Sequence, residues 1–195
     1  MNSEIEIVKN FVNFNEDETD YLIEMGKKGT TIFNPDKKRR QITLKKTNSI
    51  FKKIKLKLGT YLKQHNIGGL VILHSKKGCK QQRWHTDYDV QQVHESVSKP
   101  YGVIIALQND TKFETPNKQF ILQKGDMLLF RGDIVHAGAS YEKENTRIHV
   151  YLDVPEIKRR RNTTWFAKID DQQISRIYQD EVPNCQRLST HVRLQ

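Results

Sequence analysis

The chain has few of the residues that stabilise secreted or membrane-spanning proteins. Its two cysteines, Cys79 and Cys185, cannot form a framework of several disulfides, so an intracellular location, cytoplasmic or nuclear, is expected. No apolar run approaches the roughly 18 residues that a membrane span needs, and residues 1–15 lack the basic-then-apolar order of a signal peptide. Hydrophobic residues make up only 36% of the chain, and the mean hydropathy is -0.73. These values fit one enzyme-sized domain that carries polar arms.

The net charge of +10 is unevenly distributed along the chain. Basic residues are concentrated between residues 37 and 83, and the run at residues 37–40 is expected to be exposed. Clustered Lys and Arg side chains can neutralise phosphates. This basic segment therefore predicts contact with an acidic partner or a nucleic acid, or else a solvated face.

Residues 47–65 have the clearest helical pattern, and three interpretations of that helix stay open. Apolar residues recur at helical spacing, and most of the lysines fall off that stripe. The helix could support the back of a sheet with its lysines in solvent, bind nucleic acid, or lie on a membrane surface.

The most informative stretch contains His85 and Asp87, two positions apart. Side chains at such positions project from the same face of an extended strand. His136 follows a strand-like run and is the best candidate to complete the set. Two histidines and one carboxylate on one face form the ligand set of non-haem Fe(II) oxygenases. Taken alone, each histidine would more often be a structural residue.

Arg147 opens an alternating strand pattern eleven positions after His136. A guanidinium group on a strand beside a metal can pair with a carboxylate through two parallel hydrogen bonds. Such a site would suit the far carboxylate of a 2-oxo acid. For Arg147 alone, the default is a structural ion pair with Asp153 or Glu144.

The ordered set of His85, Asp87, His136 and Arg147 resembles that of the Fe(II)- and 2-oxoglutarate-dependent dioxygenases, most closely the prolyl 4-hydroxylase type. The resemblance covers residues 68–155. It implies a mainly β fold with flanking α-helices around a double-stranded β-helix core, of the jelly-roll or cupin-like kind. One domain of residues 1–195 would then comprise a helical support region (1–67), the core (68–155) and a basic C-terminal extension (156–195).

The resemblance also implies cofactors and site residues. Fe(II) would be held by His85, Asp87 and His136, with 2-oxoglutarate and O2 as co-substrates and ascorbate as a further candidate cofactor. Tyr101 matches the position of a tyrosine that donates its hydroxyl to 2-oxoglutarate in prolyl hydroxylases, and Tyr151 is a weaker candidate for that role. The reaction would hydroxylate a substrate while 2-oxoglutarate is decarboxylated to succinate.

The sequence leaves the substrate open. A protein side chain is favoured by the resemblance, a nucleic acid is the alternative suggested by the basic segment, and a small molecule is third. The nucleic-acid-demethylating branch carries a second Arg and an Asn after the co-substrate Arg, and this chain departs from that pattern. A non-catalytic nucleic-acid-binding module on the same barrel and a cupin-like metalloenzyme without 2-oxoglutarate are the rival interpretations.

Three other segments predict local features of the structure. Residues 89–99 are polar and lack a clear period, so they predict either a mobile lid over the site or an ordinary surface loop. Residues 113–120 predict a hairpin that turns at Pro116 and Asn117. The basic cluster at residues 158–161 is compatible with a nuclear-localisation signal, a phosphate contact or a solvated turn.

Overall fold

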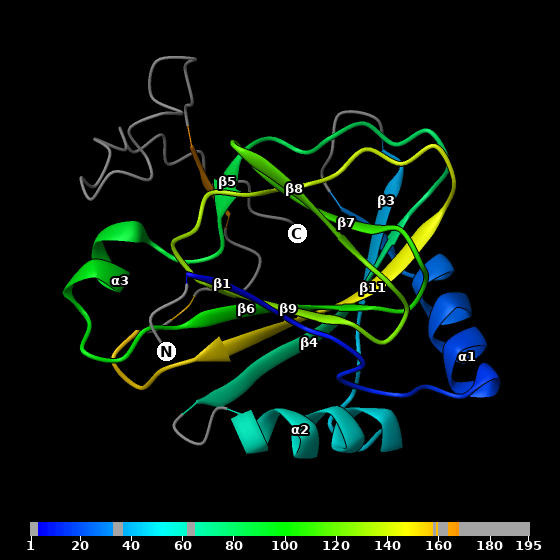
Figure 1. The fold of residues 1–195 in the computed structure, drawn as a ribbon, viewed down its shortest axis with the longest axis horizontal. Coiled ribbons are helices and arrows are strands. Elements are labelled where there is room, and N and C mark those ends of the chain that lie inside the picture. Colours follow the sequence, from blue (N-terminus) through cyan, green and yellow to red (C-terminus); the bar gives the residue numbers. More distant parts are fainter. Residues whose placement is uncertain (1–3, 33–36, 62–64, 158, 160–163, 168–195) are drawn as a thin grey trace.

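The computed structural model describes residues 4–32, 37–61, 65–157, 159 and 164–167. Figure 1 shows strands stacked in two layers, with the helices at the periphery. The elements in chain order are β1 (Ile5–Val8), α1 (Glu16–Lys27), β2 (Thr30–Thr31), β3 (Arg39–Thr43), α2 (Ser49–Tyr61), β4 (Asn66–Ser75), β5 (His85–Thr86), α3 (Val90–Glu95), β6 (Tyr101–Ala106), β7 (Thr111–Thr115), β8 (Lys118–Leu122), β9 (Met127–Arg131), β10 (Ala137–Gly138), β11 (Asn145–Asp153) and β12 (Trp165–Phe166).

The strands form one large antiparallel sheet and smaller sheets that face it. The large sheet has the order β1-β9-β6-β11-β4-β3-β2, and the smaller ones have the orders β10-β7-β8 and β12-β5. The predicted hairpin is present as β7 and β8, with Thr115 opposite Lys118 at its turn. The N-terminal region therefore supplies strands β1, β2 and β3 to the large sheet as well as two helices. The expected mainly β architecture with flanking helices is confirmed.

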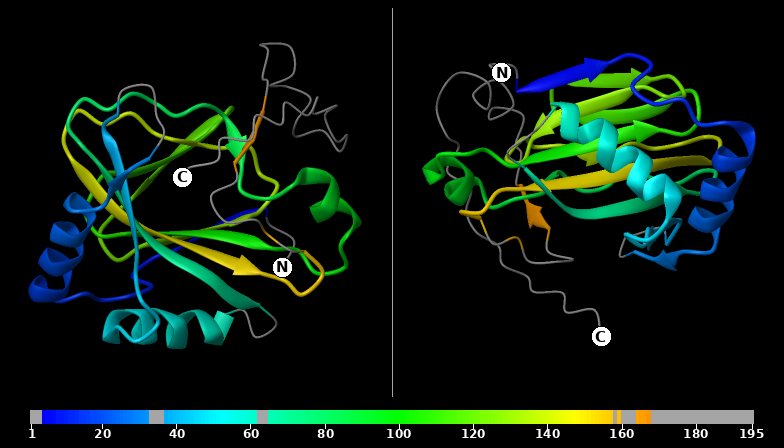
Figure 2. Two further views of the ribbon diagram at one scale, coloured as in Figure 1. Left: turned by 180° about the vertical axis from the view of Figure 1, so that it is seen from behind. Right: turned by 90° about the horizontal axis from the view of Figure 1, so that it is seen from below.

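The helices α1 and α2 cover the outer face of the large sheet. α1 begins at Asn15, whose side chain accepts a hydrogen bond from the backbone N–H of Glu18, and the Glu18 side chain in turn accepts from Asn15 N–H. α2 lies across the sheet in the second view of Figure 2, and its buried residues Ile50, Phe51, Ile54 and Leu58 join the main core cluster. The apolar face of this helix thus packs as the support-helix interpretation expected.

Strand β11 lies at the centre of the large sheet, between β6 and β4. Its residues Ile148, Val150 and Leu152 belong to the core cluster beneath the helices. Because side chains alternate along a strand, Arg147, His149 and Tyr151 project from the other face, into the space between the sheets. A second cluster, which includes Ile104 and Phe130, fills part of that space. One strand therefore supplies both the core and the polar interior.

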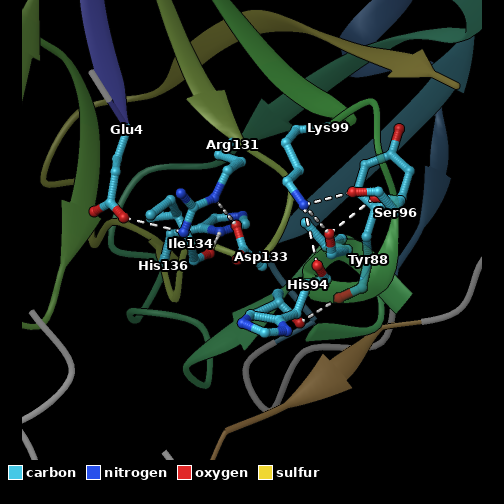
Figure 3. A network of polar contacts seen from close by, with 11 residues as sticks. Glu4, Tyr88, His94, Ser96, Lys99, Arg131, Asp133, Ile134 and His136 are labelled. Atoms are coloured by element: carbon cyan, nitrogen blue, oxygen red, sulfur yellow. Dashed lines mark hydrogen bonds and ion pairs between the residues drawn. The ribbon is translucent and has the colours of Figure 1, made fainter. Parts of the chain in front are cut away.

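Two expectations change in the structure. The polar segment 89–99 contains the short helix α3, which Asp89 caps through the N–H of Gln92 and which Lys99 closes by donating to the carbonyls of Val93, His94 and Ser96 (Figure 3). The basic run 37–40 is not uniformly exposed, because the side chain of Arg39 is only 1% exposed. In the cluster 158–161, all but Arg159 lies outside the described residues.

Among the helices described, none has the length and apolar character needed to cross a bilayer.

Candidate metal centre

The backbone brings the three proposed ligands together. His85 and His136 form an isolated antiparallel bridge, in which each backbone N–H donates to the other residue's carbonyl at 2.9 Å. Asp87 follows two positions after His85. As a result, one ligand atom from each of His85, Asp87 and His136 lies within 4.8 Å of the others. The sequence placed these residues on one face, and the structure gathers them into one cluster.

Both histidines present the same ring nitrogen to the cluster. Nδ1 of His85 lies 2.8 Å from the carbonyl of Arg83, and Nδ1 of His136 lies 2.9 Å from the carbonyl of Ile134. A carbonyl can only accept, so each Nδ1 carries the proton and each Nε2 keeps a lone pair. Metal-ligating histidines are usually fixed in this way by a backbone carbonyl. The donor set therefore fits a divalent metal such as Fe(II).

Burial and neighbouring charge keep the cluster in the protonation state that a metal requires. Burial, with a contribution from His85, lowers the pKa of His136 to about 3. Burial also lowers the pKa of His85. Burial alone would raise the pKa of Asp87, but the nearby imidazoles, His149 first, hold it well below its ordinary value. Neutral imidazoles beside an ionised carboxylate are the forms that bind a cation.

The turn that carries His136 is held by charged side chains at the end of β9. Figure 3 shows Arg131 between two carboxylates: its Nη2 lies 3.0 Å from Glu4 and its Nε lies 2.6 Å from Asp133. At Gly132 the ring of Tyr88 comes so close that an added Cβ would lie 2.3 Å from it. These contacts fix the path of the chain into the second histidine.

Arg147 projects from β11 on the same face as His149, and it is 4% exposed. Its Nη1 donates to Ser75 Oγ at 3.1 Å, and its guanidinium lies 5.5 Å from the ring centre of Tyr141. The acids considered as its structural partners are engaged elsewhere, since Asp153 pairs with Arg159 and Glu144 with Lys27. The position of Arg147 suits an anion that enters the interior.

Arg39 is a buried residue of the site region that the sequence did not reveal. Its Nη1 donates to Ser75 Oγ at 2.9 Å, the same hydroxyl that Arg147 contacts. Its Nη2 lies 2.9 Å from the carbonyl of Lys80 and 3.0 and 2.6 Å from those of Gly138 and Ala139. Arg39 thus joins the segment that leads to His85 with the one that follows His136. Arg39 lies within the basic run 37–40, and nothing in that run indicated that its side chain is buried.

The two candidate tyrosines lie on opposite faces of the large sheet. Tyr151 lies on the inner face, and its ring centre is 4.3 Å from that of His149. Tyr101 packs against the core cluster beneath the helices, and its ring contacts His65. The side chain of Tyr101 therefore faces away from the three proposed metal ligands, contrary to the expectation that it binds 2-oxoglutarate. A strand that is buried on both faces gives no pattern from which its inner face can be chosen.

His149 is the second residue that the sequence analysis missed. It is 6% exposed, and its Nε2 lies 3.1 Å from Asp87 Oδ2. The alternation Arg147, His149, Tyr151 was a usable signal, because residues two positions from Arg147 share its face.

Comparison with solved structures finds proteins of similar fold. A viral collagen prolyl hydroxylase from Paramecium bursaria Chlorella virus-1, in complex with 2-oxoglutarate, superposes with a TM-score of 0.61 at 16% identity, covering 78% of this chain and 97% of that one. HygX from Streptomyces hygroscopicus, with nickel, 2-oxoglutarate and hygromycin B bound, gives 0.61 at 10% identity, covering 81% and 86%. A Pseudomonas putida prolyl-4-hydroxylase gives 0.52 at 8% identity, covering 78% and 94%.

The chain has a prolyl-hydroxylase-like fold. The resemblance expected from the sequence is therefore confirmed at the level of architecture, including the jelly-roll core. No protein-family model and no curated protein matches the sequence. At identities of 16% or less, the superpositions show a shared fold and do not by themselves show a shared reaction.

Replacing Arg39 by Met should lower the free energy of unfolding by about 3 kcal/mol or more, because carbonyls on two segments lose a charged donor. Urea denaturation measures this loss. Lys38→Met is the matched control, since Lys38 contacts the carbonyl of Gly78 at the exposed surface, and it should change stability by less than about 1 kcal/mol. Equal losses for the two variants would contradict the clamping role of Arg39.

The metal-free protein should lose stability as the pH falls from 7 to 5. The pKa of His136 is near 3 in the folded protein and 6.5 as the reference, so in this range unfolding takes up a proton. The loss from His136 alone should be about 2 kcal/mol at pH 5, and the lowered pKa values of His85 and His74 act in the same direction. Protonation of Asp87 adds to the loss of stability only when the pH falls below the reference pKa of 3.8.

Urea denaturation at several pH values checks this dependence, with His136→Gln as the comparison. The variant should show a shallower fall in stability toward pH 5, because glutamine does not titrate. A wild-type stability that is constant or rises toward pH 5 would contradict the burial of neutral histidines.

Proposed function

We propose that the chain is an Fe(II)- and 2-oxoglutarate-dependent dioxygenase that hydroxylates a macromolecular substrate, most favourably a protein side chain. The observation that carries the proposal is the cluster of His85, Asp87 and His136, with both Nδ1 atoms occupied by backbone carbonyls. The prolyl-hydroxylase-like fold supports the same proposal independently of the cluster.

In this proposal the three ligands hold Fe(II) through the Nε2 atoms of His85 and His136 and a carboxylate oxygen of Asp87. When bound, Fe(II) supplies the activation of O2 that couples decarboxylation of 2-oxoglutarate to hydroxylation. Three ligands on one face leave positions open for the co-substrates. The protein contributes the placement of these groups and a largely buried environment, since Asp87 and His136 are 7% and 5% exposed.

Arg147 would bind the far carboxylate of 2-oxoglutarate. It lies on the strand and face that carry His149, two positions away, which corresponds to about 7 Å along a strand. His149 in turn lies 3.1 Å from Asp87. A short dicarboxylate can therefore span from the metal cluster to the guanidinium. Arg39, which contacts the same hydroxyl of Ser75, adds positive charge at that end of the interior. Of the two candidate tyrosines, Tyr151 is the one that lies on the inner face, beside His149.

The preference for a protein substrate rests on two of the structural neighbours, whose names describe prolyl hydroxylases. HygX, which was solved with hygromycin B, shows that the same architecture also accommodates a small molecule. The packing of α2 accounts for its apolar residues without a nucleic acid. Substrate pools in the functional assay distinguish these classes.

The purified protein should form succinate from 2-oxoglutarate when supplied with Fe(II), ascorbate and air, and a pool of peptides should stimulate this more than DNA or RNA. His136→Ala should lower the rate at least 100-fold, on the order of the loss expected when a metal site is broken. His94→Ala is the matched control, because His94 is exposed on α3, and it should keep the wild-type rate. Normal succinate formation by His136→Ala would contradict the proposed ligand set.

Arg147→Met should raise the 2-oxoglutarate concentration that gives half-maximal rate, with little change in metal affinity. Loss of a desolvated charge-assisted pair is expected to cost about 2–5 kcal/mol, or roughly 30-fold and upward. Arg147→Lys, which keeps the charge and loses the planar fork, should fall between wild type and Arg147→Met. An unchanged 2-oxoglutarate requirement in Arg147→Met would place the anchor elsewhere.

A further inference from the structure

The Asp87 carboxylate faces two different partners with its two oxygens. Oδ1 lies 3.8 Å from His136 Nε2, on the side of the ligand cluster. Oδ2 lies 3.1 Å from His149 Nε2, which belongs to β11 on the opposite sheet. A carboxylate that binds a metal through one oxygen leaves the other in need of a donor. His149 is placed to supply that donor.

The two facing atoms have no alternative partner among the residues that the structure describes. Asp87 Oδ2 and His149 Nε2 are both buried, and neither has a well-aligned hydrogen bond to another described group. An ionised oxygen and a ring N–H in such surroundings gain from pairing, because an unpaired buried polar atom costs about 1–3 kcal/mol. Only a small rotation of the ring or the carboxylate is needed, since the atoms are already at hydrogen-bonding distance.

The ring of His149 is held by its neighbours along and across the sheet. The Tyr151 ring centre lies 4.3 Å from it on one side, and that of Phe130 lies at 6.1 Å with an interplanar angle of 26°. Tyr151 is itself covered by the guanidinium of Arg159 at 3.9 Å, and Arg159 is fixed by Asp153 at 3.0 Å. This row of contacts restricts the imidazole to an orientation that keeps Nε2 directed at Asp87.

We infer that His149 is a positioning residue of the metal centre, which donates its Nε2–H to Asp87 Oδ2 and thereby holds Oδ1 toward the metal. The inference rests on the proposed function, since it assigns His149 a task only if the cluster binds a metal. It adds a residue outside the three-ligand set. It also connects the strand of the co-substrate arginine to the carboxylate ligand, because Arg147 and His149 share one face of β11.

The test is the affinity of the metal-free protein for Co(II), measured without substrate or turnover by titration of its visible absorption. His149→Phe removes the donor and keeps a flat ring, and it should weaken Co(II) binding 10- to 100-fold. His149→Gln places an amide N–H near the position of Nε2, and it should bind within about threefold of wild type with the same absorption bands.

His74→Gln is the matched control. His74 is also a buried histidine of the large sheet, on β4, but its Nδ1 pairs with Thr146 Oγ1, and it should leave Co(II) affinity unchanged. Near-UV circular dichroism of each metal-free variant establishes that it folds. The comparison between the Phe and Gln variants removes any effect of packing alone.

The outcomes separate this inference from the proposed function. Wild-type protein that binds Co(II) while His149→Phe binds within twofold of it would overturn the role of His149 and leave the metal site intact. Failure of His149→Gln to restore binding, or altered absorption bands in that variant, would overturn hydrogen-bond donation as its role. Failure of wild type to bind Co(II) would overturn both proposals.

Discussion

The alternation of side chains along β11 is the constraint on which both the core and the site depend. Every second residue of this strand, from Ile148 to Leu152, packs under the helices, and the residues between them face the interior. A shift of register by one residue would exchange the two sets and place Arg147 in the hydrophobic core. The dense pairing of β11 with β4 and β6 prevents such a shift. The apolar packing that stabilises the sheet therefore also fixes the polar groups of the interior.

The second constraint is the pair of backbone hydrogen bonds between His85 and His136. These residues belong to short segments that form little sheet of their own, so the bridge and the buried guanidinium of Arg39 hold the segments together. The cost of burying that cation is offset by hydrogen bonds to the carbonyls of Lys80, Gly138 and Ala139. The three proposed metal ligands are thus positioned by main-chain contacts.

The sequence predicted the parts of the site that depend on local geometry. His85 and Asp87 share a face because of strand periodicity, and His136 and Arg147 were added because their order resembles that of the Fe(II)- and 2-oxoglutarate-dependent dioxygenases. Arg39 was missed because its burial depends on carbonyls that are distant in the chain. Tyr101 was proposed from its position after His85, and β6, which is apolar on both sides, gave no period from which the face of its side chain could be predicted.

Other features depended on tertiary contacts in the same way. The alternation along β11 indicated the face on which His149 lies, but its contact with Asp87 across the barrel is a tertiary contact that no local pattern indicates. The helix α3 was not predicted because six residues with few apolar positions give no amphipathic signal. The mainly β architecture was accessible from the sequence, since alternating and fully apolar strands recur along residues 68–155. Strands β1 and β3 were not, because they pair with the distant strands β9 and β4.

The metal site can be tested with a crystal structure of the protein that contains Mn(II) in place of Fe(II) together with 2-oxoglutarate, prepared without oxygen. We expect Mn(II) to be bound by Nε2 of His85, a carboxylate oxygen of Asp87 and Nε2 of His136, with the far carboxylate of 2-oxoglutarate paired to Arg147. Mn(II) bound at other residues, or 2-oxoglutarate bound away from Arg147, would contradict this expectation.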